Sequence, residues 1–333
     1  MTQLCLSLPK TDQRDPDLIA HYYRTLGHSH PYPFNERYQA LRFLSRAYFR
    51  VIHTLAAEKA YCLSVLYLTA SDYQRVKPFS NLFGLTGSQI MRDYPDVQAI
   101  ADIELETLAA QLQTLGKGHF TQPQDNAQKL QQVARHSYPI PAHLQAVLYP
   151  ILTFTLDHIR FLTSQKERYL QLIEQHLATL PEAQDLLAFD GLGPVLVSGF
   201  LAEIQDARRF TTGQKFDRKR NCYRPRTYRD GQASVAKLAG LWWPKSDSGR
   251  AANLHPKLAR ERNPYLRYWF GQAAHSLRRS QPDYAQYYLL KSQEGSPSPR
   301  KRALVLTARK AVRLVFALLH KAQRDHLEEL PTL

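Results

Sequence analysis

The feature that most constrains the fold of this chain is a long heptad pattern in its middle. Over residues 149–180 the seam positions are spaced alternately four and three residues apart, in the order Leu152, Leu156, Ile159, Thr163, Lys166, Leu170, Ile173, Leu177 and Leu180. This spacing predicts a long helix that packs against a partner helix, and its polar centre at Thr163 and Lys166 would fix the register at a cost in stability. The partner lies in the same bundle or in a second copy of the chain. The alternative is an ordinary amphipathic helix within its own domain.

Helical periodicity also dominates the rest of the sequence. Apolar residues recur at helical spacing over 38–68 and 97–115, whereas the alternating β-branched runs typical of strands are scarce. We therefore predict a mainly α fold. Beyond residue 184 the character changes to a glycine-bearing turn, a basic stretch and two terminal helices over 263–280 and 300–323, with an exposed loop over 293–302.

Charge is distributed unevenly along the chain. The formal net charge is +15, but residues 1–207 hold 17 Lys and Arg against 20 Asp and Glu, whereas residues 208–333 hold 27 against 9. A basic excess confined to one segment favours a polyanionic partner, and nucleic acid is the partner that we expect. Ribosome association or simple solubility would account for the same composition.

The cysteine pattern and the hydropathy profile indicate a cytoplasmic protein. Cys5, Cys62 and Cys222 lie far apart without a Cys-x-x-Cys pair, so neither a disulfide framework nor a zinc site is predicted. The chain shows no signal-peptide pattern and no apolar run of about 18 residues. We expect a protein of the reducing cytoplasm that does not span a membrane.

A glycine turn in the basic half suits contact with phosphate groups. Gly191 and Gly193 precede Pro194 and an apolar run that ends at Ile204, in the form of a helix-hairpin-helix turn. Backbone N–H groups exposed at the start of the following helix would bind phosphate without reading base sequence. A tight loop between packed helices has the same pattern.

A basic and aromatic stretch follows over residues 215–229. Seven Lys or Arg stand against the single acid Asp217, interleaved with three aromatic residues. The cations would attract phosphates and the rings would stack on unpaired bases, whereas a solvated basic loop is the alternative. We expect the stretch to be mobile without its ligand. Its candidate binding residues are Lys215, Arg218, Lys219 and Arg220.

Five ordered motifs over about 80 residues give the basic half a family resemblance. They are residues 191–194, residues 201–206 with Arg209 and Phe210, residues 239–241, the pair Ser248 and Gly249, and residues 263–267. In this order they resemble the strand-transfer domain of transposases of the insertion-sequence 110 family, which runs from "PGIGP" through "LAEIGD-x-x-RF" and "AGL" to a Ser-Gly pair and "GN-x-YLR". Residues 10–15 resemble the "KTD-x-x-D" helix of the same family.

The resemblance implies a recombinase that breaks and rejoins DNA. Asp12 and Asp15 would supply two of the four acids of a RuvC-like Mg²⁺ site, and Ser248 would be the nucleophile, with Ser246 as the second choice. The family's partners, DNA and a structured RNA encoded by the element, are carried over as expectations. The heptad helix leads us to expect a homo-oligomer. The remaining candidate nucleic-acid-binding residues are Arg250, Asn263 and Arg267.

On this resemblance we divide the chain into three parts. Residues 1–36 would be the end of a RuvC-like α/β domain, residues 37–183 a helical, coiled-coil middle, and residues 184–333 a transposase domain with the helix-hairpin-helix turn and the Ser-Gly motif. The nine residues before Lys10 are too few to supply the other two acids, so we expect this polypeptide to lack cleavage activity. The alternatives are an active recombinase in a full-length form, a catalytically inactive nucleic-acid-binding remnant, and a helical scaffold unrelated to transposition.

Overall fold

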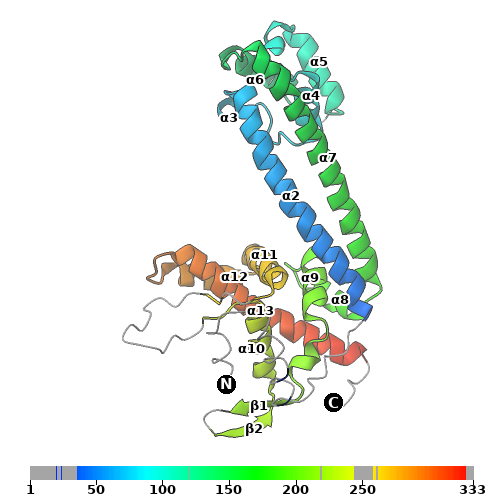
Figure 1. Cartoon of the computed structure of the whole chain (residues 1–333), viewed down its shortest axis with the longest axis vertical. Coiled ribbons are helices and arrows are strands. Elements are labelled where there is room, and N and C mark those ends of the chain that lie inside the picture. Colours follow the sequence, from blue (N-terminus) through cyan, green and yellow to red (C-terminus); the bar gives the residue numbers. More distant parts are fainter. Residues whose placement is uncertain are drawn as a thin grey trace.

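The structure, a computed structural model, describes residues 20, 24, 36–118, 120–217, 220–243, 258–259 and 262–327. Within them the chain is mainly α-helical, as predicted, with one two-stranded sheet. A stalk of two long helices joins a small helical tip to a larger helical base (Figure 1). In these residues no helix is both long and apolar enough to cross a lipid bilayer.

The stalk consists of two helices that run antiparallel to each other. After a 3-10 turn at Glu36–Tyr38, helix α2 (Gln39–Thr69) rises from the base to the tip, as predicted from residues 38–68. Helix α7 (Ala142–Ala178) returns alongside α2 and begins several residues before the predicted segment, with Pro150 inside the helix. The partner of the heptad helix is therefore α2 of the same chain.

The heptad seam of α7 contributes to two separate hydrophobic cores. Its members Leu152, Leu156 and Ile159 are buried in the core of the tip, whereas Ile173 and Leu177 belong to the core of the base. The polar seam residues Thr163 and Lys166 are half-buried between these two cores, where the seam carries little apolar surface. Because the seam of α7 is apolar at both ends and polar in its centre, the pair of α2 and α7 contributes to both cores.

Short helices form the tip. They are α3 (Tyr73–Val76), α4 (Leu85–Asp93), a 3-10 helix at Val97–Asp102, α5 (Leu105–Leu115) and α6 (Pro123–His136). The single helix predicted over 97–115 was wrong, because the segment is split at Ile103 and Glu104, which have extended backbone angles. The buried residues Val97 and Ile100 are three apart, a spacing that the three-residue turn of a 3-10 helix places on one face.

The base is assembled around one buried helix. Its elements are α8 (Pro181–Leu187), α9 (Pro194–Ile204), a 3-10 turn at Ala207–Phe210, the strands β1 (Gln214–Asp217) and β2 (Cys222–Pro225), α10 (Tyr228–Leu238), α11 (Pro264–Ser280), α12 (Pro282–Gln293) and α13 (Pro299–His326). Every residue of α9 from Leu196 onward is buried. The two terminal helices are confirmed as α11 and α13. Helix α12 was not predicted, and the loop before α13 is shorter than expected.

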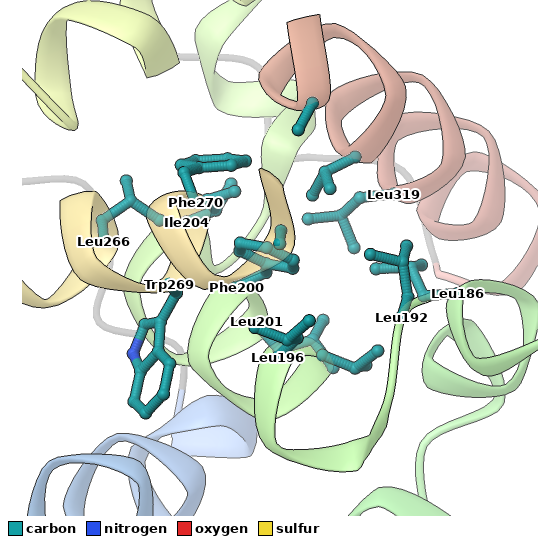
Figure 2. Packing of buried hydrophobic residues seen from close by; sticks show 14 of the residues in the cluster. Leu186, Leu192, Leu196, Phe200, Leu201, Ile204, Leu266, Trp269, Phe270 and Leu319 are labelled. Atoms are coloured by element: carbon teal, nitrogen blue, oxygen red, sulfur yellow. The ribbon is translucent and has the colours of Figure 1, made fainter. Parts of the chain in front are cut away.

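A close helix crossing in the base lies between α9 and α11. Phe200 and Phe270 stack with their ring centroids 4.7 Å apart, and Trp269 lies beside them and points toward the stalk (Figure 2). The two helices approach at Gly199, where an added Cβ would lie 2.4 Å from Cδ1 of Trp269. A residue without a side chain is required at this crossing because the indole fills the space.

Candidate nucleic-acid interface

The turn before α9 places its two glycines in different surroundings. Gly191 has a φ of +99° and lies against α11, where an added Cβ would come within 2.3 Å of the Ser280 hydroxyl oxygen. Conformation and packing therefore both require glycine at Gly191. Gly193 is exposed, an added Cβ there would contact nothing within 4 Å, and its N–H donates to none of the residues that the structure describes. The accessible part of the predicted phosphate-binding turn is Gly193 and the start of α9.

The basic stretch forms a β-hairpin followed by a helix. β1 pairs with β2 in antiparallel register, with Lys215 opposite Arg224 and Phe216 opposite Tyr223. Arg220 is exposed in the turn that joins the strands. This hairpin was not predicted from the sequence, although the charged residues at 215 and 217 alternate with the aromatic residue at 216, as in a strand. One period of alternation is a weak signal.

A single carboxylate ties the hairpin to α10. Asp230 accepts hydrogen bonds from Lys215 Nζ at 2.5 Å and from Arg224 Nη1 at 2.6 Å. Asp230 also forms a capping box with Thr227, in which each side chain accepts from the other residue's backbone N–H. Hydrogen bonds from Arg224, then Lys215, hold the pKa of Asp230 well below its ordinary value. The positive charge of Lys215 is thus compensated within the protein.

Asn263 contributes to the architecture of the base. Its side-chain oxygen accepts from the Leu266 N–H at 3.0 Å and caps α11, while its amide nitrogen donates to Glu203 at 2.6 Å. Glu203 is only 4% exposed and also receives a bidentate pair of hydrogen bonds from Arg46 of the stalk, at 2.7 and 3.0 Å. Both ends of the Asn263 amide are therefore engaged, and they join α9, α11 and α2.

Arg267, one turn into α11, is half-buried. Its Nη1 donates to the carbonyl of Ala259 at 3.3 Å, and burial, together with the charge of Arg262, lowers its pKa. An arginine stays protonated under these conditions because its ordinary pKa is above about 12. The start of α11 therefore carries two positive charges close together.

Six predicted site residues lie outside the residues that the structure describes. They are Asp12, Asp15, Arg218, Lys219, Ser248 and Arg250. The described residues on either side of the segment with Ser248 are Trp243 and Leu258, and both line a cavity of about 770 Å³ at the start of α13. In the described ranges, no cluster of three or more His, Cys, Asp or Glu side chains could hold a metal ion.

The sequence analysis also missed a basic cavity between α10 and α13. Its volume is about 360 Å³, and three arginines, one from α10 and two from α13, line it together with Gln232 and small apolar residues. The arginines are Arg229, Arg309 and Arg313. The available signal was the spacing of Arg309 and Arg313, since residues four apart share one face of a helix.

Taken together, these features describe a helical protein whose base presents a basic hairpin, a glycine turn and an arginine-lined cavity. No protein-family model matches the chain. Over 76 residues the chain is 34% identical to a protein of Pseudomonas aeruginosa named "Probable family 20 transposase". The match covers 23% of this chain and 22% of that protein, about a fifth of its length. This similarity links the chain to transposases at the level of one segment.

Proposed function

We propose that this chain is a transposase of the insertion-sequence 110 family and that its base binds nucleic acid. The observation that carries the binding proposal is the hairpin of β1 and β2, a basic element that Asp230 anchors to α10 and that exposes Arg220 at its turn. A fixed basic element binds phosphates with less loss of conformational freedom than a solvated loop does. The similarity to a transposase supports the choice of nucleic acid over other polyanions.

The glycine turn adds a second point of attachment to this proposal. The N–H of Gly193 donates to none of the described residues and lies at the positive end of the α9 dipole, which suits a backbone phosphate. Phosphate contacts of this kind position a strand without reading its bases. DNA and a structured RNA are the proposed partners, and the proposed setting is a homo-oligomer in the cytoplasm.

The catalytic part of the proposal rests on the resemblance in sequence. In a full-length form that supplies the other two acids, Asp12 and Asp15 would hold Mg²⁺, which would supply charge stabilisation at a phosphate oxygen. Ser248 would attack the phosphodiester, and Arg250 would stabilise the negative charge that develops. Strand breakage and rejoining is the reaction that these residue types would serve.

The salt dependence of nucleic-acid affinity tests the binding proposal. In the triple variant R218A/K219A/R220A we expect the slope of log K against log salt to fall by roughly one unit for each phosphate that the variant no longer neutralises. The control is R50A/R160A/R168A, which removes the same charge from exposed positions on the stalk. A hairpin variant whose slope equals that of the stalk variant would exclude the hairpin from the interface.

A further inference from the structure

The cavity between α10 and α13 gathers three positive charges that the fold alone does not require. Arg309 and Arg313 lie one turn apart on α13, and Arg229 reaches the same cavity from the first turn of α10. The cavity is also lined by the buried apolar residues Ala236 and Val312 and by the exposed Ala233. The small size of these apolar residues leaves a cavity of about 360 Å³ beside the three arginines, within the usual range for binding pockets.

None of the three guanidinium groups has a hydrogen-bond or ion-pair partner among the residues that the structure describes. Three other cations of the base are paired: Lys215 and Arg224 with Asp230, and Arg208 with Asp206 at 2.7 Å. No acidic residue of the described ranges lines the cavity. Like charges four residues apart on one helix repel each other, so this arrangement is unfavourable until an anion enters.

We propose that this cavity binds a backbone phosphate of a nucleic-acid strand, an inference that rests on the proposed function and extends it. Guanidinium groups suit phosphate because their planar forks donate two parallel hydrogen bonds to its oxygens. Gln232, whose side chain also hydrogen-bonds Tyr228, is a further polar group at the cavity that could contact the neighbouring sugar or base.

The position of the cavity favours a strand over a small free anion. β2 ends at Pro225, and Arg229 follows four residues later in α10, so the cavity lies next to the foot of the basic hairpin. A strand bound along the hairpin would reach the cavity without crossing acidic surface, because the intervening carboxylate, Asp230, is already paired with Lys215 and Arg224. Hairpin and cavity thus form one continuous route for a phosphate backbone.

Binding measurements on the whole chain test this inference. The variant R229Q/R309Q/R313Q is compared with the stalk variant R50Q/R160Q/R168Q, which loses the same charge, using labelled single-stranded DNA and RNA of one sequence. For the cavity variant we expect the slope of log K against log salt to fall by about 0.7 for each phosphate released, and affinity at moderate salt to fall about tenfold. R309K/R313K should lie between the wild type and the cavity variant because lysine keeps the charge but loses the fork.

The outcomes separate this inference from the hairpin proposal. If the cavity variant binds as the stalk variant does while R218A/K219A/R220A is impaired, the cavity inference is overturned and the hairpin proposal stands. If the cavity variant is impaired while R218A/K219A/R220A binds as its stalk control does, the cavity inference is supported and the hairpin is excluded from the interface. A wild-type chain that binds neither DNA nor RNA refutes both. The tighter of the two wild-type complexes identifies whether the strand is DNA or RNA.

A measurement without nucleic acid gives a second readout. Sulfate carries the same tetrahedral oxygens as phosphate, so at equal ionic strength it should raise the Tm of the wild type above its value in chloride. Part of that rise is a general salt effect and will also occur in the stalk variant. The cavity variant should lose the additional part. An equal sulfate effect in the wild type and the cavity variant would argue against an anion site, and far-UV circular dichroism verifies that each variant is folded.

Discussion

The substitution Gly199→Ala tests the helix crossing that organises the base. A Cβ at this position would lie 2.4 to 2.6 Å from three atoms of the Trp269 indole, whereas ordinary contacts begin near 3.4 Å. The ring would have to move by about 1 Å to restore an ordinary separation, yet Trp269 is only 1% exposed and is packed against Phe49 and Tyr268. Overpacking of a filled core costs about 1–3 kcal/mol, and we expect the upper end here because the neighbours leave no free space.

The same substitution also improves helix propensity, which offsets part of that cost. Alanine is favoured over glycine inside a helix by about 1 kcal/mol, so the net loss of unfolding free energy should be roughly 2 kcal/mol. For a folding unit of about 150–250 residues, a loss of roughly 2 kcal/mol corresponds to a fall in Tm of about 4–8 °C. Thermal and urea unfolding followed by far-UV circular dichroism measure both quantities.

A matched control exists in the neighbouring helix. An added Cβ at Gly271 of α11 would contact nothing within 4 Å, so Gly271→Ala should be neutral or should stabilise the protein by up to about 1 kcal/mol. Combining Gly199→Ala with Trp269→Phe should recover part of the loss attributed to the clash. If Gly199→Ala were as stable as Gly271→Ala, the close crossing would be refuted.

Two further predictions concern single residues of the base. Gln205 has a φ of +59°, a conformation that favours glycine, and the resembling motif carries glycine at this position. Gln205→Gly should therefore raise the unfolding free energy by about 1 kcal/mol. A lower unfolding free energy of the variant in a urea titration would contradict backbone strain at Gln205. Burial lowers the pKa of His320, which contacts Tyr228 and Phe316, so the folded state binds a proton less readily than the unfolded state does. The contribution of neutral His320 to the unfolding free energy should be fully present above about pH 6.5 and should be lost as the pH drops toward the lowered pKa. His320→Gln should flatten this pH dependence of the unfolding free energy. An unchanged pH profile in the variant would show that other groups cause the dependence.

The long helices were predictable because their apolar periodicity is sustained over many turns. The seam from Leu152 to Leu177 revealed that α7 needs a partner, but it did not identify α2 because an intramolecular and an intermolecular partner leave the same pattern. The split of the segment 97–115 escaped prediction because i, i+3 spacing fits both helix types over one turn.

The candidate site was less predictable because its geometry depends on partners distant in sequence. Asn263 was selected as a binding residue, yet its amide is engaged by Glu203, sixty residues earlier, and by the start of α11. Lys215 was selected for its charge, and Asp230 compensates that charge. In contrast, Arg309 and Arg313 drew no attention in the sequence, and Arg229 was counted only as one cation of the basic stretch, because only the packing of α10 on α13 brings the three together.

Hydrogen–deuterium exchange of the whole chain, with and without a single-stranded oligonucleotide at low ionic strength, tests the central claim most directly. We expect slower exchange in the hairpin Gln214–Pro225, the start of α10 and the Arg309–Arg313 face of α13, with no change in α4, α5 and α6 of the tip. Protection confined to the tip, or no protection anywhere while the oligonucleotide is bound, would contradict a nucleic-acid interface on the base.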